Sequence, residues 1–277
     1  MFTVVNQSKV KKLDVETITF DEISRWKFDF QHYFKNTPVV FKGAAVNWTA
    51  FKKWQPEYFK DVYGDRSFRV AYNHQGVFNY CEDCDTGAVE SLDKPMHEIV
   101  DLISKENSTY YLKQCNMKRD FPELLQDIDP PKILRRLKEI LVINFWFGGG
   151  GCKSPLHFDR ADNFFVQLLG KKRVTLFPPS AGKYLYPSED KKRPHISRVN
   201  IFAPDEDMYP LLKDAKKEKI VVELEPGDVL YIPSLWWHGV ESLGTSISVN
   251  IWWAGSVSIA LFRFRMFMRS LFTRRAA

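Results

Sequence analysis

Alternation of hydrophobic and polar positions dominates the second half of the chain and predicts a β-rich fold. Residues 246–252 alternate with a period of two, as a strand with one buried face does. Residues 163–169 and 172–177 form two further apolar runs, and residues 229–233 follow the turn signal Glu225-Pro-Gly-Asp228. The chain is therefore expected to be rich in strands from Val142 to Trp253 and mainly β overall, with flanking helices.

The first half of the chain mixes strand and helix patterns. Residues 37–43, 67–72 and 110–112 predict strands, whereas residues 54–63 and 96–103 carry the spacing of helices. Residues 202–219 interrupt the strand-rich half and are expected to form a helical insert or a loop.

The last part of the chain has a different pattern. Residues 256–275 carry nine large apolar side chains among five arginines. This predicts a helix whose apolar surface exceeds a narrow stripe, so that packing on the domain or self-association is favoured over a membrane surface. We expect a homodimer formed through this helix and no stable membrane association.

Composition and cysteine usage add little to this picture. The 40 basic and 34 acidic residues leave a net charge of +6, which only weakly favours an acidic partner such as RNA. The chain starts with no signal-peptide pattern and has no apolar run of ~18 residues, so we expect a cytoplasmic protein, with a nuclear location as the alternative. Cys81 and Cys84 form a single CxxC pair, which favours free thiols over a structural zinc site or a redox pair.

The segment Pro155-Leu-His157-Phe-Asp159 carries the strongest chemical signal. In a strand, residues two apart project to the same side, so His157 and Asp159 would share a face. A second histidine, His238, follows two tryptophans. A lone histidine there would more often be part of the core, but two histidines and one carboxylate are the facial ligand set of non-haem Fe(II) oxygenases. We therefore expect His157, Asp159 and His238 to be both the catalytic and the metal-binding residues.

A lysine is the second chemical signal. The runs 163–169 and 172–177, joined by Gly170-Lys171, predict a β-hairpin in which Leu169 pairs with Lys172. Lys172 and Asn163 would then share the inner face, and the buried ammonium would need an anion such as a dicarboxylate co-substrate. The neighbouring Lys171 and Arg173 are expected to be solvated.

Several short motifs between Thr37 and Trp253 frame these residues. They are Tyr110-Tyr111-Leu112, Asn144-Phe-Trp146-Phe-Gly, Ser154-Pro-Leu-His157-Phe-Asp159, Asn163-Phe-Phe, Gly170-Lys-Lys172-Arg, Leu176-Phe-Pro-Pro, Leu185-Tyr-Pro187, Pro226-Gly-Asp-Val-Leu-Tyr-Ile-Pro233, Trp236-Trp-His238 and Val249-Asn250-Ile-Trp252. With these motifs the chain resembles the JmjC/cupin-like oxygenases that depend on Fe(II) and 2-oxoglutarate. The resemblance is to the small hydroxylase branch, which includes asparaginyl and arginyl protein hydroxylases and the tRNA wybutosine hydroxylase.

The resemblance implies a fold, a set of cofactors and residue roles. The fold would be a double-stranded β-helix, that is, a jelly-roll or cupin barrel. Fe(II) would be bound by the histidine and aspartate triad, and 2-oxoglutarate would be the co-substrate. Its distal carboxylate would be held by Lys172, Ser154 and Tyr111, with Asn163 and Asn250 beside the metal.

These expectations combine into a domain division and a function. Residues 1–141 would support the barrel, residues 142–255 would form its catalytic core, and residues 256–277 would be the C-terminal helix. The expected activity is hydroxylation of a C–H of a protein side chain. A tRNA base or a small molecule are alternative substrates, and a non-oxygenase metal-binding cupin is the alternative class, which Lys172 disfavours. Residues 72–87 and 188–200 are expected to line the substrate entrance.

Overall fold

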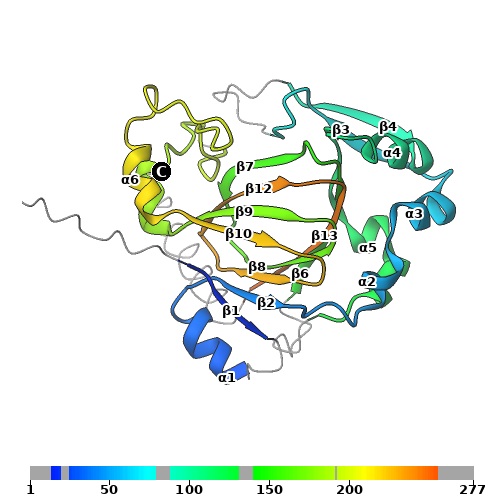
Figure 1. The fold of residues 1–277 in the computed structure, drawn as a ribbon, viewed down its shortest axis with the longest axis horizontal. Coiled ribbons are helices and arrows are strands. Elements are labelled where there is room, and N and C mark those ends of the chain that lie inside the picture. Colours follow the sequence, from blue (N-terminus) through cyan, green and yellow to red (C-terminus); the bar gives the residue numbers. More distant parts are fainter. Residues whose placement is uncertain (1–13, 20–24, 79–87, 131–139, 191, 255–277) are drawn as a thin grey trace, which may run out of the picture.

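The computed structural model describes residues 14–19, 25–78, 88–130, 140–190 and 192–254, and the β-strands of these ranges form two sheets (Figure 1). The larger sheet has the order β1 (Glu16–Thr19), β2 (Val39–Lys42), β11 (Val229–Ile232), β8 (Asp162–Leu169), β13 (Ser246–Trp253), β6 (Ile140–Gly148), β5 (Tyr110–Asn116), β3 (Ser67–Tyr72) and β4 (Glu90–Pro95). The smaller sheet has the order β10 (Ile220–Leu224), β9 (Lys172–Phe177), β12 (Trp237–Ser242) and β7 (Lys153–Phe158).

Short helices accompany the strands, mostly along the larger sheet (Figure 1). The α-helices are α1 (Arg25–Phe28), α2 (Thr49–Lys53), α3 (Pro56–Tyr63), α4 (Met96–Ile103), α5 (Met117–Asp120) and α6 (Leu212–Ala215). Five-residue π-helix η2 (Asp29–Tyr33) continues α1, and 3₁₀ turns form η3 (Pro122–Asp127), η5 (Pro179–Tyr184) and η6 (Lys216–Glu218). This arrangement confirms the predicted jelly-roll fold, mainly β with flanking helices.

The hydrophobic core is divided by the larger sheet. Between the sheets, Phe165 and Leu230 pack with Val174 and Leu176 of the smaller sheet. On the outer face, β-strand side chains pack with the helices, which is why Phe164 belongs to a different cluster from its neighbour Phe165. Strand β8 is therefore buried on both faces, which is why its sequence is mostly apolar and does not alternate.

The predicted β-hairpin around Gly170-Lys171 is wrong. Strands β8 and β9 lie in different sheets, so these two residues carry the chain from one sheet to the other. The backbone of Lys172 pairs with Ser242 and Leu224, and not with Leu169. A two-residue turn with a glycine is the same local signal for a hairpin and for a crossing between sheets, and only the long-range partners distinguish them.

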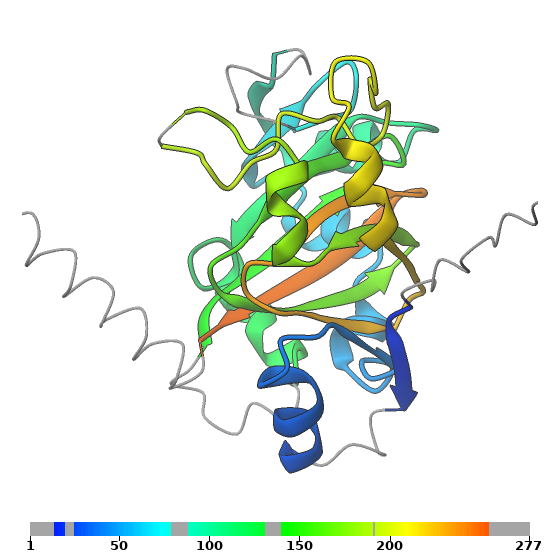
Figure 2. The same cartoon turned by 90° about the vertical axis from the view of Figure 1, so that its left-hand side faces the viewer.

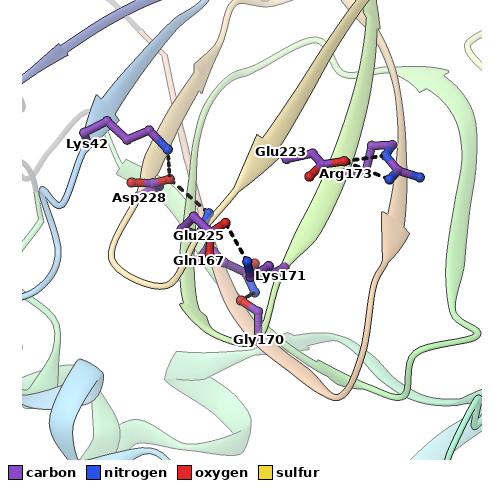
Figure 3. Close-up of polar contacts among 8 residues, drawn as sticks. All are labelled: Lys42, Gln167, Gly170, Lys171, Arg173, Glu223, Glu225 and Asp228. Atoms are coloured by element: carbon purple, nitrogen blue, oxygen red, sulfur yellow. Dashed lines mark hydrogen bonds and ion pairs between the residues drawn. The ribbon is translucent and has the colours of Figure 1, made fainter.

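Gly170 makes this crossing sterically possible. Its φ of +65° is in the left-handed region, and a Cβ there would lie 2.1 Å from the backbone oxygen of Thr245. Gln167 Nε2 donates to the backbone oxygens of Leu169 and Gly170 at 2.6 and 2.9 Å, which fixes the crossing from one side. Beyond it, Lys171 pairs with Glu225 (Figure 3).

Proline sets the start of a helix that the sequence pattern predicted. The pattern predicted a helix over residues 54–63, and α3 starts two residues later, at Pro56, whereas α2 was not predicted. Gln55 is extended, with φ −116° and ψ 158°, because the ring of a following proline disfavours the helical conformation. Of the expected insert over residues 202–219, only α6 and η6 are helical.

Different elements cover the two ends of the barrel. The insert between β9 and β10 and the β3–β4 pair lie at one end, and β1 and α1 lie at the other, as both views show (Figures 1 and 2). Among the described helices, none is long and apolar enough to cross a membrane. The expected C-terminal helix and the Cys81/Cys84 pair lie outside the described residues, and the domain boundary at residue 142 stays a prediction.

Candidate active site

Two neighbouring strands of the smaller sheet bring two histidines together. In the antiparallel pair β7–β12, His157 stands opposite His238, and their ring centroids are 4.3 Å apart. Asp159 follows the last residue of β7. Its carboxylate oxygens lie 4.0 Å from Nε2 of His157 and 3.7 Å from Nε2 of His238.

The histidine tautomers suit metal binding. Nδ1 of His157 lies 2.8 Å from the backbone oxygen of Pro155, and Nδ1 of His238 lies 3.0 Å from that of Trp236. A carbonyl oxygen only accepts hydrogen bonds, so each Nδ1 carries the proton and each Nε2 keeps its lone pair. Burial, reinforced by the nearby His157, lowers the pKa of His238 to about 4, so this imidazole is neutral near pH 7.

The donor set of these three side chains fits a divalent iron ion. One ligand atom from each residue can be chosen so that all lie within 4.8 Å of one another. Imidazole nitrogens with a carboxylate on one face are the ligands that non-haem Fe(II) takes in oxygenases. The structure thus assembles the predicted triad, although Asp159 lies just beyond the strand and not within it.

A buried cation contacts Tyr111, a residue that lines the same cavity as the triad. Lys172 is 1% exposed, and its Nζ donates to the hydroxyl groups of Tyr111 and Ser248 at 3.2 and 2.9 Å. Within the described ranges, no carboxylate forms an ion pair with it. Burial lowers its pKa to about 7, because a charge removed from water without a counter-charge is disfavoured.

The surroundings of Lys172 suit an anionic ligand group. Burial raises the pKa of Tyr111, so its phenol stays protonated, and its hydroxyl is also within hydrogen-bonding reach of Ser154. Tyr111 and Ser154 both line the active-site cavity, as Phe165 does, whose ring lies 5.4 Å from the Lys172 ammonium. A carboxylate entering this cavity would therefore meet two hydroxyl groups and the ammonium behind them.

The active-site cavity has a volume of about 170 Å³ and is bounded by both sheets. Within the part of the chain that the structure describes, several buried polar atoms near it have no hydrogen-bond partner: Asn250 Oδ1, Trp146 Nε1 and Trp252 Nε1. Buried polar groups are normally paired, so these atoms fit a polar ligand held in the cavity.

Most of the predicted site residues converge on this cavity. The triad, Ser154, Tyr111 and Asn250 line it, and Lys172 lies behind Tyr111. Asn163 is buried in β8 without lining the cavity, and both polar atoms of its side chain have no partner among the described residues.

Sequence analysis missed three residues. Ser248 could have been found, because it precedes Asn250 by two positions on the same strand face. Gln114 lines the cavity from a bulge in β5, and His195 from a loop, and neither environment has a periodicity that would reveal it.

This fold and site define the class of the protein. The profile of the cupin-like domain family matches residues 26–258, and the chain belongs to this family, among the JmjC oxygenases that use Fe(II) and 2-oxoglutarate.

Relatives that are named for a function include lysine-specific demethylases and a protein of tRNA wybutosine synthesis. The chain is 32% identical over 262 residues to "Lysine-specific demethylase 8" of Danio rerio, covering 91% of this chain and 60% of the relative. It is 33% identical over 226 residues to "Lysine-specific demethylase JMJ30" of Arabidopsis thaliana, covering 80% and 51%. It is also 29% identical over 245 residues to "tRNA wybutosine-synthesizing protein 5" of Mus musculus, covering 83% and 75%. The chain therefore spans about half to three fifths of the length of the demethylase relatives.

Proposed function

We propose that this protein is an Fe(II)- and 2-oxoglutarate-dependent dioxygenase that hydroxylates a C–H of a protein side chain. The observation that carries the proposal is the placement of two features at one cavity. His157, Asp159 and His238 offer an iron site, and Lys172 offers a buried cation without a carboxylate partner in the described chain. A cupin that only binds a metal has no need of such a cation.

Each group has a role that follows from its position. The imidazole Nε2 atoms and the Asp159 carboxylate would hold iron, with the two Nδ1–H···O=C bonds fixing the ring planes. Lys172, with Tyr111 and Ser154, would hold the far carboxylate of 2-oxoglutarate by charge-assisted hydrogen bonds. When bound, iron and 2-oxoglutarate supply the oxidising chemistry that activates dioxygen.

The protein also shapes the space around the reaction. Phe165, Trp146 and Trp252 line the cavity and would help to exclude water from it, while Asn250 and the indole N–H groups offer hydrogen bonds to a ligand. His195 enters from the predicted entrance loop over residues 188–200 and would contact whatever approaches the triad.

Mass spectrometry of candidate substrates tests the proposal. Purified protein with Fe(II) and 2-oxoglutarate is incubated with a peptide digest of cellular proteins and, separately, with total tRNA. We expect peptides that gain one oxygen atom, and none with Asp159→Ala. An oxygen gained only by the tRNA would support the oxygenase chemistry but overturn the assignment to a protein side chain.

A further inference from the structure

A second cavity, of about 390 Å³, lies next to the active site and has several cations in its lining. Among the described residues, its lining has one carboxylate, that of Asp120, and four basic side chains: Arg66, Arg69, Lys113 and Arg119. We name it the β3–β5 cavity. Neither the iron site nor the 2-oxoglutarate site uses any of these residues.

The β3–β5 cavity arises because two strands separate. Strand β3 pairs with β4 along six residues, but it pairs with β5 only at Ala71↔Tyr111 and Tyr72↔Tyr110. Beyond that point β5 follows β6 and bulges between Leu112 and Cys115. The cavity occupies the space between the diverging strands, so it is part of the sheet architecture and not a gap between loops.

The charge of this cavity is incompletely balanced. Arg119 is held by Asp120 at 2.7 and 2.8 Å, and Arg66 lies 3.8 Å from Glu123. Arg69 has no ion pair within the described ranges. Burial also lowers the pKa of Lys113 to about 8, because a charge removed from water is disfavoured. Guanidinium groups are suited to bind an oxyanion through paired hydrogen bonds.

One residue connects the two cavities. Gln114 lines both the β3–β5 cavity and the active-site cavity, and its φ of +52° is in the left-handed region. The bulge in β5 thus places one residue at both the cavity with the cations and the cavity with the iron site. An extended chain advances about 3.3 Å per residue, so a substrate could occupy both cavities with residues a few positions apart.

The gathering of cations in one hollow favours a peptide over a nucleic acid as the occupant. On the barrel, Lys42 pairs with Asp228, Lys171 with Glu225, and Arg173 with Glu223 (Figure 3). A surface for a phosphate backbone needs an extended run of available cations, because affinity grows with the number of phosphates neutralised. One concentrated hollow instead suits a single acidic side chain.

We infer that the β3–β5 cavity binds an aspartate or glutamate side chain of the protein substrate, a few residues from the residue that is hydroxylated. The inference rests on the proposed function for the nature of the substrate. It adds that substrates are selected by an acidic residue near the target.

Fluorescence anisotropy with a labelled oligo-glutamate peptide tests this inference, with an oligo-glutamine peptide of equal length as the reference probe. Iron and 2-oxoglutarate are omitted, and the ionic strength is low. The wild type should bind oligo-glutamate more tightly than oligo-glutamine. Arg69→Gln should weaken oligo-glutamate binding about fivefold or more, because it removes the cation without an ion pair. Asp120→Asn should tighten it about twofold, because it removes a competing carboxylate, and a folding defect would not have this effect.

Lys171→Gln is the matched control, since it removes one exposed positive charge that is paired with Glu225. It should change the affinity by less than about twofold. Equal affinity for the two peptides, or equal losses in Arg69→Gln and Lys171→Gln, would overturn the inference. Tighter binding of an RNA of equal charge that is weakened by Arg69→Gln would also overturn it and assign the cavity to nucleic acid.

The peptide-binding result can be distinguished from a failure of the proposed oxygenase function. Succinate formation without peptide binding in the β3–β5 cavity would contradict only this inference. Binding that depends on Arg69 in a protein that forms no succinate would contradict only the oxygenase assignment.

Discussion

Lys172 shows how a single residue can define the chemistry of the site. Its ammonium is buried, touches two hydroxyl groups, and meets no carboxylate in the described part of the chain. The sequence placed it correctly, but through a hairpin register that does not exist. The prediction that Lys171 and Arg173 are exposed and that Lys172 is buried is confirmed. It succeeded because the alternation of side chains along a strand does not depend on the partner strand.

Truncation of Lys172 should weaken co-substrate binding without loss of iron. Lys172→Ala removes a charge-assisted interaction of about 1.5–3 kcal/mol, so the affinity for 2-oxoglutarate should fall roughly ten- to hundredfold. Isothermal titration measures this, with the exposed neighbour changed in Lys171→Ala as the control. Unchanged affinity in Lys172→Ala would mean that this lysine does not bind the co-substrate.

The lowered pKa of Lys172 predicts a pH dependence of binding. The free protein loses this proton as pH rises through about 7, whereas a bound carboxylate favours the ammonium and raises its pKa. Affinity for 2-oxoglutarate should therefore be greatest below about pH 7 and fall about tenfold or more between pH of about 6.5 and about 8.5. The slope should be absent in Lys172→Ala. Wild-type affinity that is constant or rises over this range would contradict the assignment.

The residues of the triad could be predicted because their signal is local. His157 and Asp159 are two positions apart, and His238 has its own short motif. Gln114 and His195 could not be predicted, since a β-bulge and a loop of the insert bring them to the cavity.

At the scale of elements, the connections were harder to predict than the strands. Strands β8, β9, β11 and β13 were predicted from their patterns, but the allocation of β8 and β9 to different sheets was not. Alternation reports which face of a strand is buried and gives no information on the partner strand. The start of α3 was placed two residues too early although Pro56 marks it, because the apolar spacing continues across the proline.

The crossing between the sheets yields a stability prediction. Gly170→Ala places a Cβ close to the Thr245 backbone in a left-handed conformation, so the free energy of unfolding should fall by about 1–3 kcal/mol. Gly244→Ala is the control, because a Cβ there meets nothing within 4 Å, and it should change stability by less than about 0.5 kcal/mol. Urea denaturation of both variants measures the difference, and equal stabilities would show that Gly170 is not required for the crossing.

At the scale of the whole molecule, the architecture followed from the family resemblance, whereas the assembly stays a prediction. The jelly-roll barrel is confirmed, with helices covering the outer face of the larger sheet. The alternation of hydrophobic and polar positions, without the resemblance, indicated only a β-rich fold. The closure of two sheets around a cavity depends on pairings between distant segments, such as β2 with β11 and β5 with β6.

The sequence after residue 254 predicts that the protein forms a homodimer. Its Phe and Met content predicts that residues 256–275 form part of a self-complementary homodimer interface. Phe264→Glu combined with Phe267→Glu should produce a monomer that still binds iron, as measured by light scattering and metal titration. A wild-type monomer that sediments with anionic vesicles would contradict the dimer and favour a membrane-surface helix.

The central claim, that the triad and the buried lysine form an oxygenase site, is tested most directly by measuring succinate produced from 2-oxoglutarate. The assay compares the wild type with Asp159→Ala, with and without Fe(II), and uses the exposed-site variant Asp61→Ala as the control. We predict iron-dependent succinate formation in the wild type and in Asp61→Ala, and none in Asp159→Ala, which lacks the carboxylate ligand. Succinate formation that does not need iron, or that persists undiminished in Asp159→Ala, would contradict the account.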